Sequence, residues 1–306
     1  MTTLATAAEN YLTIRRALGV ALVGPGRLLT DYVAHLDAKN LSTVTVASAV
    51  DWAGAPAGVT RAQIAVRLSV ARGFAGYLAA FDPSTEIPPA HLLHGAAGRR
   101  TPFLFTDDQV EALMAAAARL ASPLHAASFA TLIGLMAATG LRTAEARRLD
   151  RDDVDLEGST LTVACSKFGK TRQIPLHPST TTAVADYLRR RDQLCPNPLD
   201  DSLLITATGR RLHHVGDTFA RLLAEVGIKA PPGRRPPRLH DLRHGFAVAT
   251  LRDWHAADDD VQRHLPALST YLGHVNPEHT YWYLQAVPEL MAVLADRVEA
   301  SQRAQR

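Results

Sequence analysis

The sequence predicts a mainly α-helical protein with one small antiparallel sheet, an α+β fold in two parts. Apolar residues recur at helical spacing over most of the 306 residues. Alternating and β-branched residues are confined to 154–176, which predicts a single sheet. Proline and glycine gather between residues 82 and 102 and interrupt both patterns. A chain of this length is also expected to hold about two domains.

Residues 1–82 are expected to form a small all-α domain. Helical spacing runs from Leu28 to Leu36 after a break at 24–26. Thr43 is expected to cap a short helix that reaches Trp52, and Thr60 to begin a longer amphipathic helix through Phe81. One face of that longer helix is basic, which indicates either nucleic-acid contact or ordinary solubility. Its cations are Arg61, Arg67 and Arg72.

Residues 83–102 are expected to be an extended linker, with Arg99 and Arg100 near its end. The second domain, 103–306, should open with a helix capped by Thr106 and Gln109. The further elements expected are a helix over 124–138, a short helix from Thr143 to Leu149, strands over 154–156, 159–165 and 171–176 with a hairpin loop at 166–170, helices over 179–193, 215–226, 239–251 and 261–272, and a last helix from Pro288 to about 300.

Composition limits the class of protein. No apolar run reaches about 18 residues and no signal-peptide pattern opens the chain, so we expect a cytoplasmic, nucleoid-associated protein without a membrane span. The 2 cysteines are far apart and exclude a disulfide framework or a cysteine-based zinc site. The net charge is only +3, but residues 209–243 hold eight cations (Arg210, Arg211, Arg221, Lys229, Arg234, Arg235, Arg238, Arg243) against three acids (Asp217, Glu225, Asp241). That local excess favours a polyanionic partner over a merely solvated loop.

A set of separated cations and imidazoles suits attack on a phosphodiester. Such attack needs a nucleophile, cations for the phosphate oxygens and a proton for the leaving oxygen. Arg142 and Arg243 are the expected phosphate ligands, because a guanidinium binds two oxygens at once. Glu145 is placed to brace Arg142. In the hairpin loop, Lys167 or Lys170 could protonate the leaving oxygen, or both could contact the DNA backbone.

Two histidine positions and three tyrosines complete this set. His240 lies on the same helix face as Arg243 and is expected to accept or relay a tyrosine proton. His244 forms a His-x3-His pair with His240, but no nearby cysteine, carboxylate or HExxH motif completes a site, so we expect no metal. In the stretch 268–284, His274 precedes the candidate nucleophiles. These are Tyr271, Tyr281 and Tyr283, among which residue chemistry does not choose.

Four blocks give the chain its family resemblance: TGLRTAEARRL, SKFGKTRQIPL, HDLRHGFA and LGHVNPEHTYWYL. Together, in this order, they resemble the tyrosine recombinase (phage integrase) family, and the ending is most similar to enzymes of mobile elements. The main local departures are Phe168, where a small residue is usual after the lysine, and the aromatic pair that precedes Tyr283. The resemblance assigns the catalytic roles to Arg142, Lys167, His240, Arg243, His274 and the nucleophile Tyr283, with Glu145 in support.

The resemblance also implies a fold, a reaction and partners. An N-terminal core-binding (SAM-like) domain and a catalytic domain would hold duplex DNA, and Tyr283 would form a 3′-phosphotyrosine without metal, ATP or other cofactor. The family acts as a homo-tetramer on paired DNA sites, with accessory or sister recombinases in some cases, and the helix after Pro288 would dock on a neighbour. The expected DNA contacts are Arg61, Arg67, Arg72, Arg99, Arg100, Lys170, Arg172, Arg234, Arg235 and Arg238. Alternatives are a type IB-like topoisomerase, a catalytically silent DNA-binding regulator and a histidine-based metal hydrolase.

Overall fold

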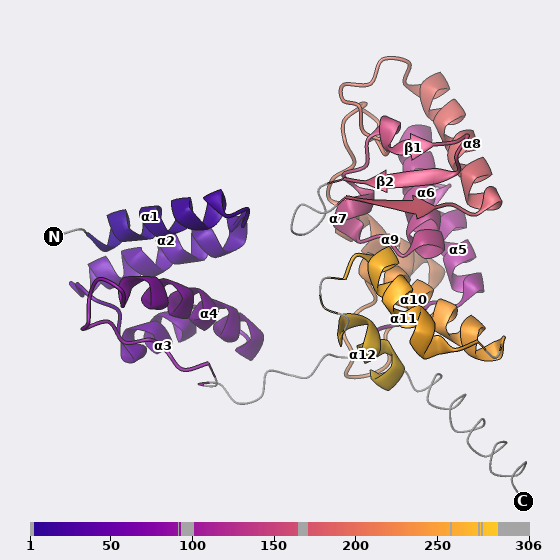
Figure 1. The fold of residues 1–306 in the computed structure, drawn as a ribbon. Coiled ribbons are helices and arrows are strands. Elements are labelled where there is room, and N and C mark those ends of the chain that lie inside the picture. The colour runs from indigo at the N-terminus through magenta and orange to yellow at the C-terminus, as the bar shows by residue number, and fades with distance from the viewer. Residues whose placement is uncertain are drawn as a thin grey trace, which may run out of the picture. The chain divides into compact units, whose positions relative to one another are not determined.

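The computed structural model describes residues 3–90, 92, 101–164, 171–257, 259–274, 276 and 278–286, without the side chains of 279, 285 and 286. The chain divides into two compact units, Met1–Arg100 and Thr101–Arg306 (Figure 1). Helices dominate both units, and the strands of the described residues form one three-stranded antiparallel sheet in the second unit. The predicted fold class is therefore confirmed. None of the described helices is both long and apolar enough to cross a membrane.

The described residues of the first unit form a four-helix module built around aromatic residues. Its helices are α1 (Leu4–Ala17), α2 (Val23–Ala38), α3 (Val46–Gly54) and α4 (Arg61–Leu78). Tyr32, Trp52 and Phe74 are almost fully buried between them. Burial of three large rings supplies much of the apolar area that stabilises so small a unit.

Local capping chemistry sets the helix boundaries of this unit. The predicted cap at Thr60 is present, because its hydroxyl accepts from the Gln63 amide while the Gln63 side chain accepts from the Thr60 amide. The predicted cap at Thr43 is wrong: Thr45 caps α3, and the Thr43 hydroxyl donates to Asp82 instead. The segment 24–26 is also no break, since the first turn of α2 contains it and tolerates its proline.

The second unit is organised around one apolar helix, α6 (Pro123–Thr139), against which α5 (Asp107–Ala117), α8 (Pro178–Leu194) and α10 (Leu239–Ala256) pack. The remaining elements are α7 (Thr143–Ala146), a 3-10 turn (Arg151–Asp153), α9 (Val215–Val226), α11 (Val261–Leu272) and α12 (Glu278–Ala286). Figure 1 shows α10, α11 and α12 grouped at the end of the unit away from α8. The capping box of Thr106 and Gln109 on α5 is as predicted.

The sheet consists of β1 (Val154–Asp155), β2 (Thr160–Val163) and β3 (Arg172–Pro175) in sequence order. Its register pairs Leu161 with Ile174 and Val163 with Arg172. Leu161, Val163 and Ile174 are buried, so alternate side chains join the core of the unit while the others face away. The predicted hairpin loop, which carries Lys167 and Lys170, and the predicted helix after Pro288 lie outside the described residues.

A separate apolar cluster fixes α12 on α10 and α11. Leu251 of α10 and the α11 residues Leu265, Leu268 and Leu272 are buried together with Tyr283 of α12. No helix was predicted over 278–286, because that segment is short and its pattern is dominated by polar and aromatic residues. The cluster explains why it is helical: tertiary packing outweighs weak local preference.

Candidate active site

Arg142 occupies the N-cap position of α7, two residues after Gly140, which ends α6. Gly140 has φ +60°, and a Cβ there would lie 2.5 Å from the Phe246 ring, so glycine alone permits this sharp turn. Thr143 was the predicted cap, but the cap position falls on Arg142, whose amide donates to Glu145 Oε2 at 3.0 Å. The turn therefore places the Arg142 side chain at a fixed point beside the end of α6.

Glu145 is the buried carboxylate that holds two arginines. Its Oε1 accepts from Arg142 Nη1 at 2.6 Å, and both of its oxygens accept from the guanidinium of Arg172 on β3, at 3.2 and 2.8 Å. Burial acts to raise the Glu145 pKa, but the hydrogen bonds from Arg172 and the Arg142 amide outweigh it and lower the pKa to about 2. Glu145 is thus an anion at neutral pH and is bonded to the Arg142 guanidinium.

Arg172, for which a DNA contact is predicted, is bonded within the protein. Besides its ion pair with Glu145, its Nε donates to the Tyr271 carbonyl at 2.9 Å, and its side chain is only 11% exposed. A guanidinium so fully bonded within the protein has few donors left for DNA. The structure makes Arg172 a support that joins β3, α7 and α11.

Gly273 links the arginines to the LGH segment. Its carbonyl accepts from Arg142 Nη2 at 2.6 Å, and it ends α11 with φ +67°. A Cβ at this position would lie 2.8 Å from Arg172 Nη1 and 3.4 Å from Arg142 Nη1. A glycine is therefore required by both the backbone angle and the close packing of two guanidinium groups.

Arg243 lies inside α10 and is 1% exposed. Its Nη1 donates to the Gly140 carbonyl and its Nη2 to the Leu272 carbonyl, both at 2.7 Å, so it joins the ends of α6 and α11. Burial and the nearby charge of Arg142 lower its pKa to about 10. Within the described part of the chain, no ion pair joins Arg243 to a carboxylate. Two arginines held this close leave a net positive site that suits an anion.

His240 and His244 stand one turn apart on α10, with ring centroids 4.9 Å apart. Burial and the charge of Arg243 lower the His240 pKa to about 4. Burial, His240 and Arg243 lower the His244 pKa to about 3. Both imidazoles are therefore neutral at pH 7. Nδ1 of His244 lies 2.8 Å from the hydroxyl oxygen of Tyr283.

The structure separates the three tyrosines that chemistry left open. Tyr283 is 2% exposed and its ring stacks on that of His274, with centroids 6.5 Å apart. Tyr281 is 45% exposed. Tyr271 stacks on Phe246, and burial raises its pKa to about 12, which makes its phenolate harder to form. Tyr283 is thus the tyrosine in contact with the imidazoles.

His274 is held from two sides. Its amide donates to the Ser269 carbonyl at 2.9 Å, which continues the end of α11, and its Nδ1 lies 2.7 Å from the Thr280 hydroxyl on α12. Thr280 is fully buried. His274 therefore joins the end of α11, through its amide, to α12, through its imidazole, on which the Tyr283 ring stacks.

The remaining residues predicted to act in catalysis or to contact DNA differ in whether the structure describes them and in how exposed they are. Lys167, Lys170, Arg99 and Arg100 lie outside the described residues. Arg234 and Arg238, before α10, are exposed, and Arg235 lies 3.6 Å from Asp241. In the described residues no group of three histidine, cysteine or carboxylate side chains could hold a metal ion.

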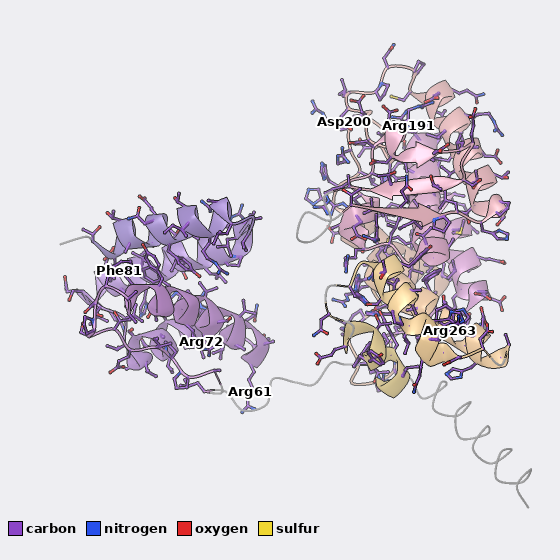
Figure 2. The ribbon with its side chains drawn as sticks, in the orientation of Figure 1. Arg61, Arg72, Phe81, Arg191, Asp200 and Arg263 are labelled. Carbon is purple, nitrogen blue, oxygen red and sulfur yellow. The ribbon has the colours of Figure 1, made fainter. Side chains whose placement is uncertain are left out.

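The basic face of α4 is not one continuous surface. Arg61 is exposed, and Figure 2 shows it at the end of the first unit. Arg67 instead packs on Trp52, with its guanidinium carbon 3.9 Å from the ring centroid, and Arg72 donates to the carbonyls of Pro88 and Pro89. Arg67 and Arg72 therefore have structural bonds that sequence spacing did not reveal.

Sequence reasoning also missed two contributions to the site. His244 was considered only as a metal ligand, although its i+4 spacing from His240 placed both on one helix face. Arg172 was predicted to contact DNA, because its position on a strand next to the hairpin gave no sign of a bond to Glu145. Such contacts between distant segments depend on tertiary packing and leave no local pattern.

Comparison with known proteins gives the family context. Residues 104–289 match the phage integrase family. Two Sinorhizobium fredii proteins that carry the names integrase/recombinase y4rB and y4rE are 40% and 35% identical to this chain. The alignments cover 98% of this chain and of y4rB, and 94% of this chain and of y4rE. The tyrosine recombinase XerC of Alcanivorax borkumensis is 32% identical, over 78% of this chain and 73% of its own length.

Solved structures share the fold. The XerH site-specific recombinase bound to a palindromic difH substrate aligns with a TM-score of 0.65 at 18% identity, covering 97% of this chain and 85% of that one. The Tn1549 transposon integrase in complex with a circular intermediate DNA aligns with a TM-score of 0.64 at 17% identity, over 95% and 99%.

Proposed function

Because this chain belongs to the phage integrase family and is a tyrosine-type DNA recombinase, we propose that Tyr283 is its nucleophile and that it cuts DNA through a 3′-phosphotyrosine. The observation that carries this is the convergence of three segments on one positive site. Arg142 donates to the Gly273 carbonyl. Arg243 donates to the carbonyls of Gly140 and Leu272. The Tyr283 hydroxyl lies against the imidazole of His244, the residue after Arg243.

The proposed reaction uses the site as follows. The guanidinium groups of Arg142 and Arg243 bind the non-bridging oxygens of the scissile phosphate and stabilise the charge that develops on them. The Tyr283 oxygen bonds to phosphorus, and the bond from phosphorus to the 5′ oxygen breaks. The phenolic proton goes to His240, whose pKa a bound phosphate would raise, and Lys167 gives a proton to the leaving oxygen. A 5′-hydroxyl of a partner strand reverses these steps, so neither ATP nor metal is needed.

We assign the remaining residues supporting roles. His274, with its ring on Tyr283 and its other side on Thr280, donates to the scissile phosphate once DNA is bound. Glu145 keeps Arg142 in place. Since Arg172, Arg67 and Arg72 are bonded within the protein, the stronger candidates for phosphate contact are the exposed cations. Of the predicted DNA contacts that the structure describes, Arg61, Arg234 and Arg238 are exposed.

The partners proposed are duplex DNA and further copies of the chain. The XerH and Tn1549 integrase structures contain DNA substrates, and another structural neighbour is a lambda integrase dimer on a core site. By analogy, we propose that residues 1–82 and 103–306 both bind one duplex, that 83–102 connect them, and that a homo-tetramer joins two sites, with or without a sister recombinase. Action on a mobile element, in the cytoplasm and at the nucleoid, fits this function.

A covalent trap tests the proposed function. The full chain is incubated with a pool of nicked duplexes that lose a short 5′-ended fragment after cleavage, and protein-linked DNA is isolated and sequenced. We expect an adduct that resists boiling in detergent, forms in excess EDTA and enriches a defined sequence. Absence of an adduct on every duplex that the chain binds would contradict the proposal. Two-site strand exchange, rather than relaxation of one supercoiled circle, then distinguishes a recombinase from a topoisomerase.

A further inference from the structure

The contact between His244 and Tyr283 reaches the oxygen of the proposed nucleophile. The distance of 2.8 Å from Nδ1 to the phenolic oxygen is that of a strong hydrogen bond. The rings are 5.5 Å apart and tilted by 59°, so the contact is edgewise. The phenol is almost fully buried, and a polar group in that position is normally held by a specific partner.

The position of His244 ties this contact to the phosphate site. It follows Arg243 directly on α10, and the two bonds of Arg243 to Gly140 and Leu272 fix that turn of the helix. A group that holds the tyrosine and a group that binds the phosphate are thus consecutive residues of one rigid element. Their backbone positions relative to one another are therefore fixed as long as helix α10 is intact.

We propose that His244 is a positioning residue for Tyr283: its Nδ1 accepts the phenolic hydrogen bond and aims the oxygen at a phosphate held by Arg142 and Arg243. This inference rests on the proposed function and extends it to a residue whose role was not evident in the sequence. In this arrangement the imidazole is neutral and carries its proton on Nε2, which leaves Nδ1 free to accept.

Positioning explains the surroundings of His244 better than proton acceptance does. A free phenol has a pKa of about 10, whereas burial, His240 and Arg243 hold the His244 pKa at about 3. In the free protein, transfer of the phenolic proton to either α10 imidazole is strongly unfavourable, since the His240 pKa is also held at about 4 until a phosphate binds, while a hydrogen bond to His244 is not. His244 therefore holds the proton donor and another group takes the proton.

Two substitutions separate these roles. In His244→Asn, the amide oxygen can occupy the place of Nδ1 and accept the phenol, but an amide is not a base. In His244→Leu, no acceptor is left. The rate of covalent adduct formation is measured for the full chain on a nicked duplex that the wild type cleaves. Duplex affinity and thermal unfolding are measured on the same samples, so that a folding defect is recognised.

We expect His244→Leu to slow adduct formation by about 100-fold, the scale of a 1 Å misplacement of a reacting group. Duplex affinity should remain within about 3-fold of the wild type. His244→Asn should recover to within about 10-fold of the wild type, with an unchanged pH profile above pH 5. A wild-type rate in His244→Leu would overturn the inference. So would an Asn variant as slow as the Leu variant with normal affinity, since a base would then be required.

The Tyr283→Phe variant tests the proposed function separately from the positioning role of His244. Tyr283→Phe is included on the same duplex, and its adduct must vanish if Tyr283 is the nucleophile. An adduct that persists in Tyr283→Phe contradicts the proposed function. Loss in both His244 variants, with Tyr283→Phe inactive, contradicts only the positioning role.

Discussion

The carboxylate of Glu145 and the guanidinium of Arg172 form a two-pronged ion pair between α7 and β3, with Nη2 to Oε2 at 2.8 Å and Nη1 to Oε1 at 3.2 Å. The two residues are 27 positions apart, and the pair is almost completely removed from water. The pair also holds Arg142 in place, because the same carboxylate accepts a hydrogen bond from the Arg142 guanidinium.

Because of this ion pair, the free energy of unfolding should depend on pH in the acidic range. The Glu145 pKa falls from 4.5 to about 2 on folding, so its contribution is fully present above pH 4.5 and is lost as the pH falls from 4.5 toward 2. A shift of this size corresponds to about 3 kcal/mol of unfolding free energy. We expect Glu145→Gln to reduce that free energy by about 3 kcal/mol at pH 7, and by much less at pH 3. Urea unfolding of both proteins at the two pH values measures this, and an equal loss at both would contradict the ion pair's role.

Gly273 should be far less replaceable than a glycine with the same backbone angle elsewhere. Gly273→Ala must place a methyl group against Arg172, whereas Gly233 has φ +75° and open space around it. Left-handed strain alone costs about 1 to 2 kcal/mol. We expect Gly233→Ala to lose only that amount, and Gly273→Ala to lose more and to cleave at least about 10-fold more slowly. Thermal unfolding and the adduct assay compare the pair; matching losses would show that the contact with Arg172 is unimportant.

Arg142 and Arg147 provide a test of whether the positive site is catalytic or merely binds DNA. Arg142 faces the Gly273 carbonyl, while Arg147 donates to the Leu212 carbonyl outside the site. Loss of one donor to a developing charge costs about 100- to 1000-fold in rate. We expect Arg142→Ala to slow adduct formation by that factor with duplex affinity nearly unchanged, and Arg147→Ala to have little effect on either.

A similar comparison applies to Arg243, where removal of the side chain would leave the Gly140 and Leu272 carbonyls without donors. Arg243→Lys keeps the charge but loses the fork that binds two oxygens. It should also cleave at least about 100-fold more slowly. Equal losses for Arg142, Arg147 and Arg243 variants, accompanied by equal losses of affinity, would mean that the site is a DNA-binding surface.

The two α10 imidazoles make stability depend on pH in a second window. Because folding lowers the His244 pKa from 6.5 to about 3, its contribution is present above pH 6.5 and is lost as the pH falls below that value. Between pH 6.5 and 5, most surface carboxylates stay ionised, and one such histidine should cost about 1.5 kcal/mol of unfolding free energy. The His244→Asn variant should lose that part of the dependence of its unfolding free energy on pH. A variant with the wild-type slope would show that His244 is not buried in its neutral form.

The sequence predicted the parts of the fold that depend on local chemistry. Capping residues such as Thr60 and Thr106 and the apolar run of α6 identified helices well, because each signal lies within the element it defines. The helix around Tyr283 was not predicted, since its stability comes from packing on α10 and α11. Cap positions also moved by one or two residues, at Thr45 and at Arg142, where competing hydrogen bonds decide.

The sequence allowed the residue types of the candidate site to be predicted, but not the hydrogen bonds that hold them together. The spacing of Arg142, His240, Arg243, His274 and Tyr283 carried the family pattern, and the structure brings these residues together. The carbonyls of Gly140, Leu272 and Gly273 that orient the arginines have no side-chain signature. Arg67, Arg72 and Arg172 are bonded within the protein, which a positive charge in a sequence does not reveal, and their contact with DNA stays a prediction.

The most direct measurement is covalent adduct formation by Tyr283→Phe and Tyr281→Phe on one nicked duplex, with duplex affinity as the control. Both residues lie on α12, but Tyr283 is buried beside His244 and His274 while Tyr281 is 45% exposed. We predict that Tyr283→Phe binds the duplex normally and forms no detectable adduct, whereas Tyr281→Phe forms it at a rate within about 3-fold of the wild type. An undiminished adduct in Tyr283→Phe, or its loss only in Tyr281→Phe, would contradict the assignment of the nucleophile.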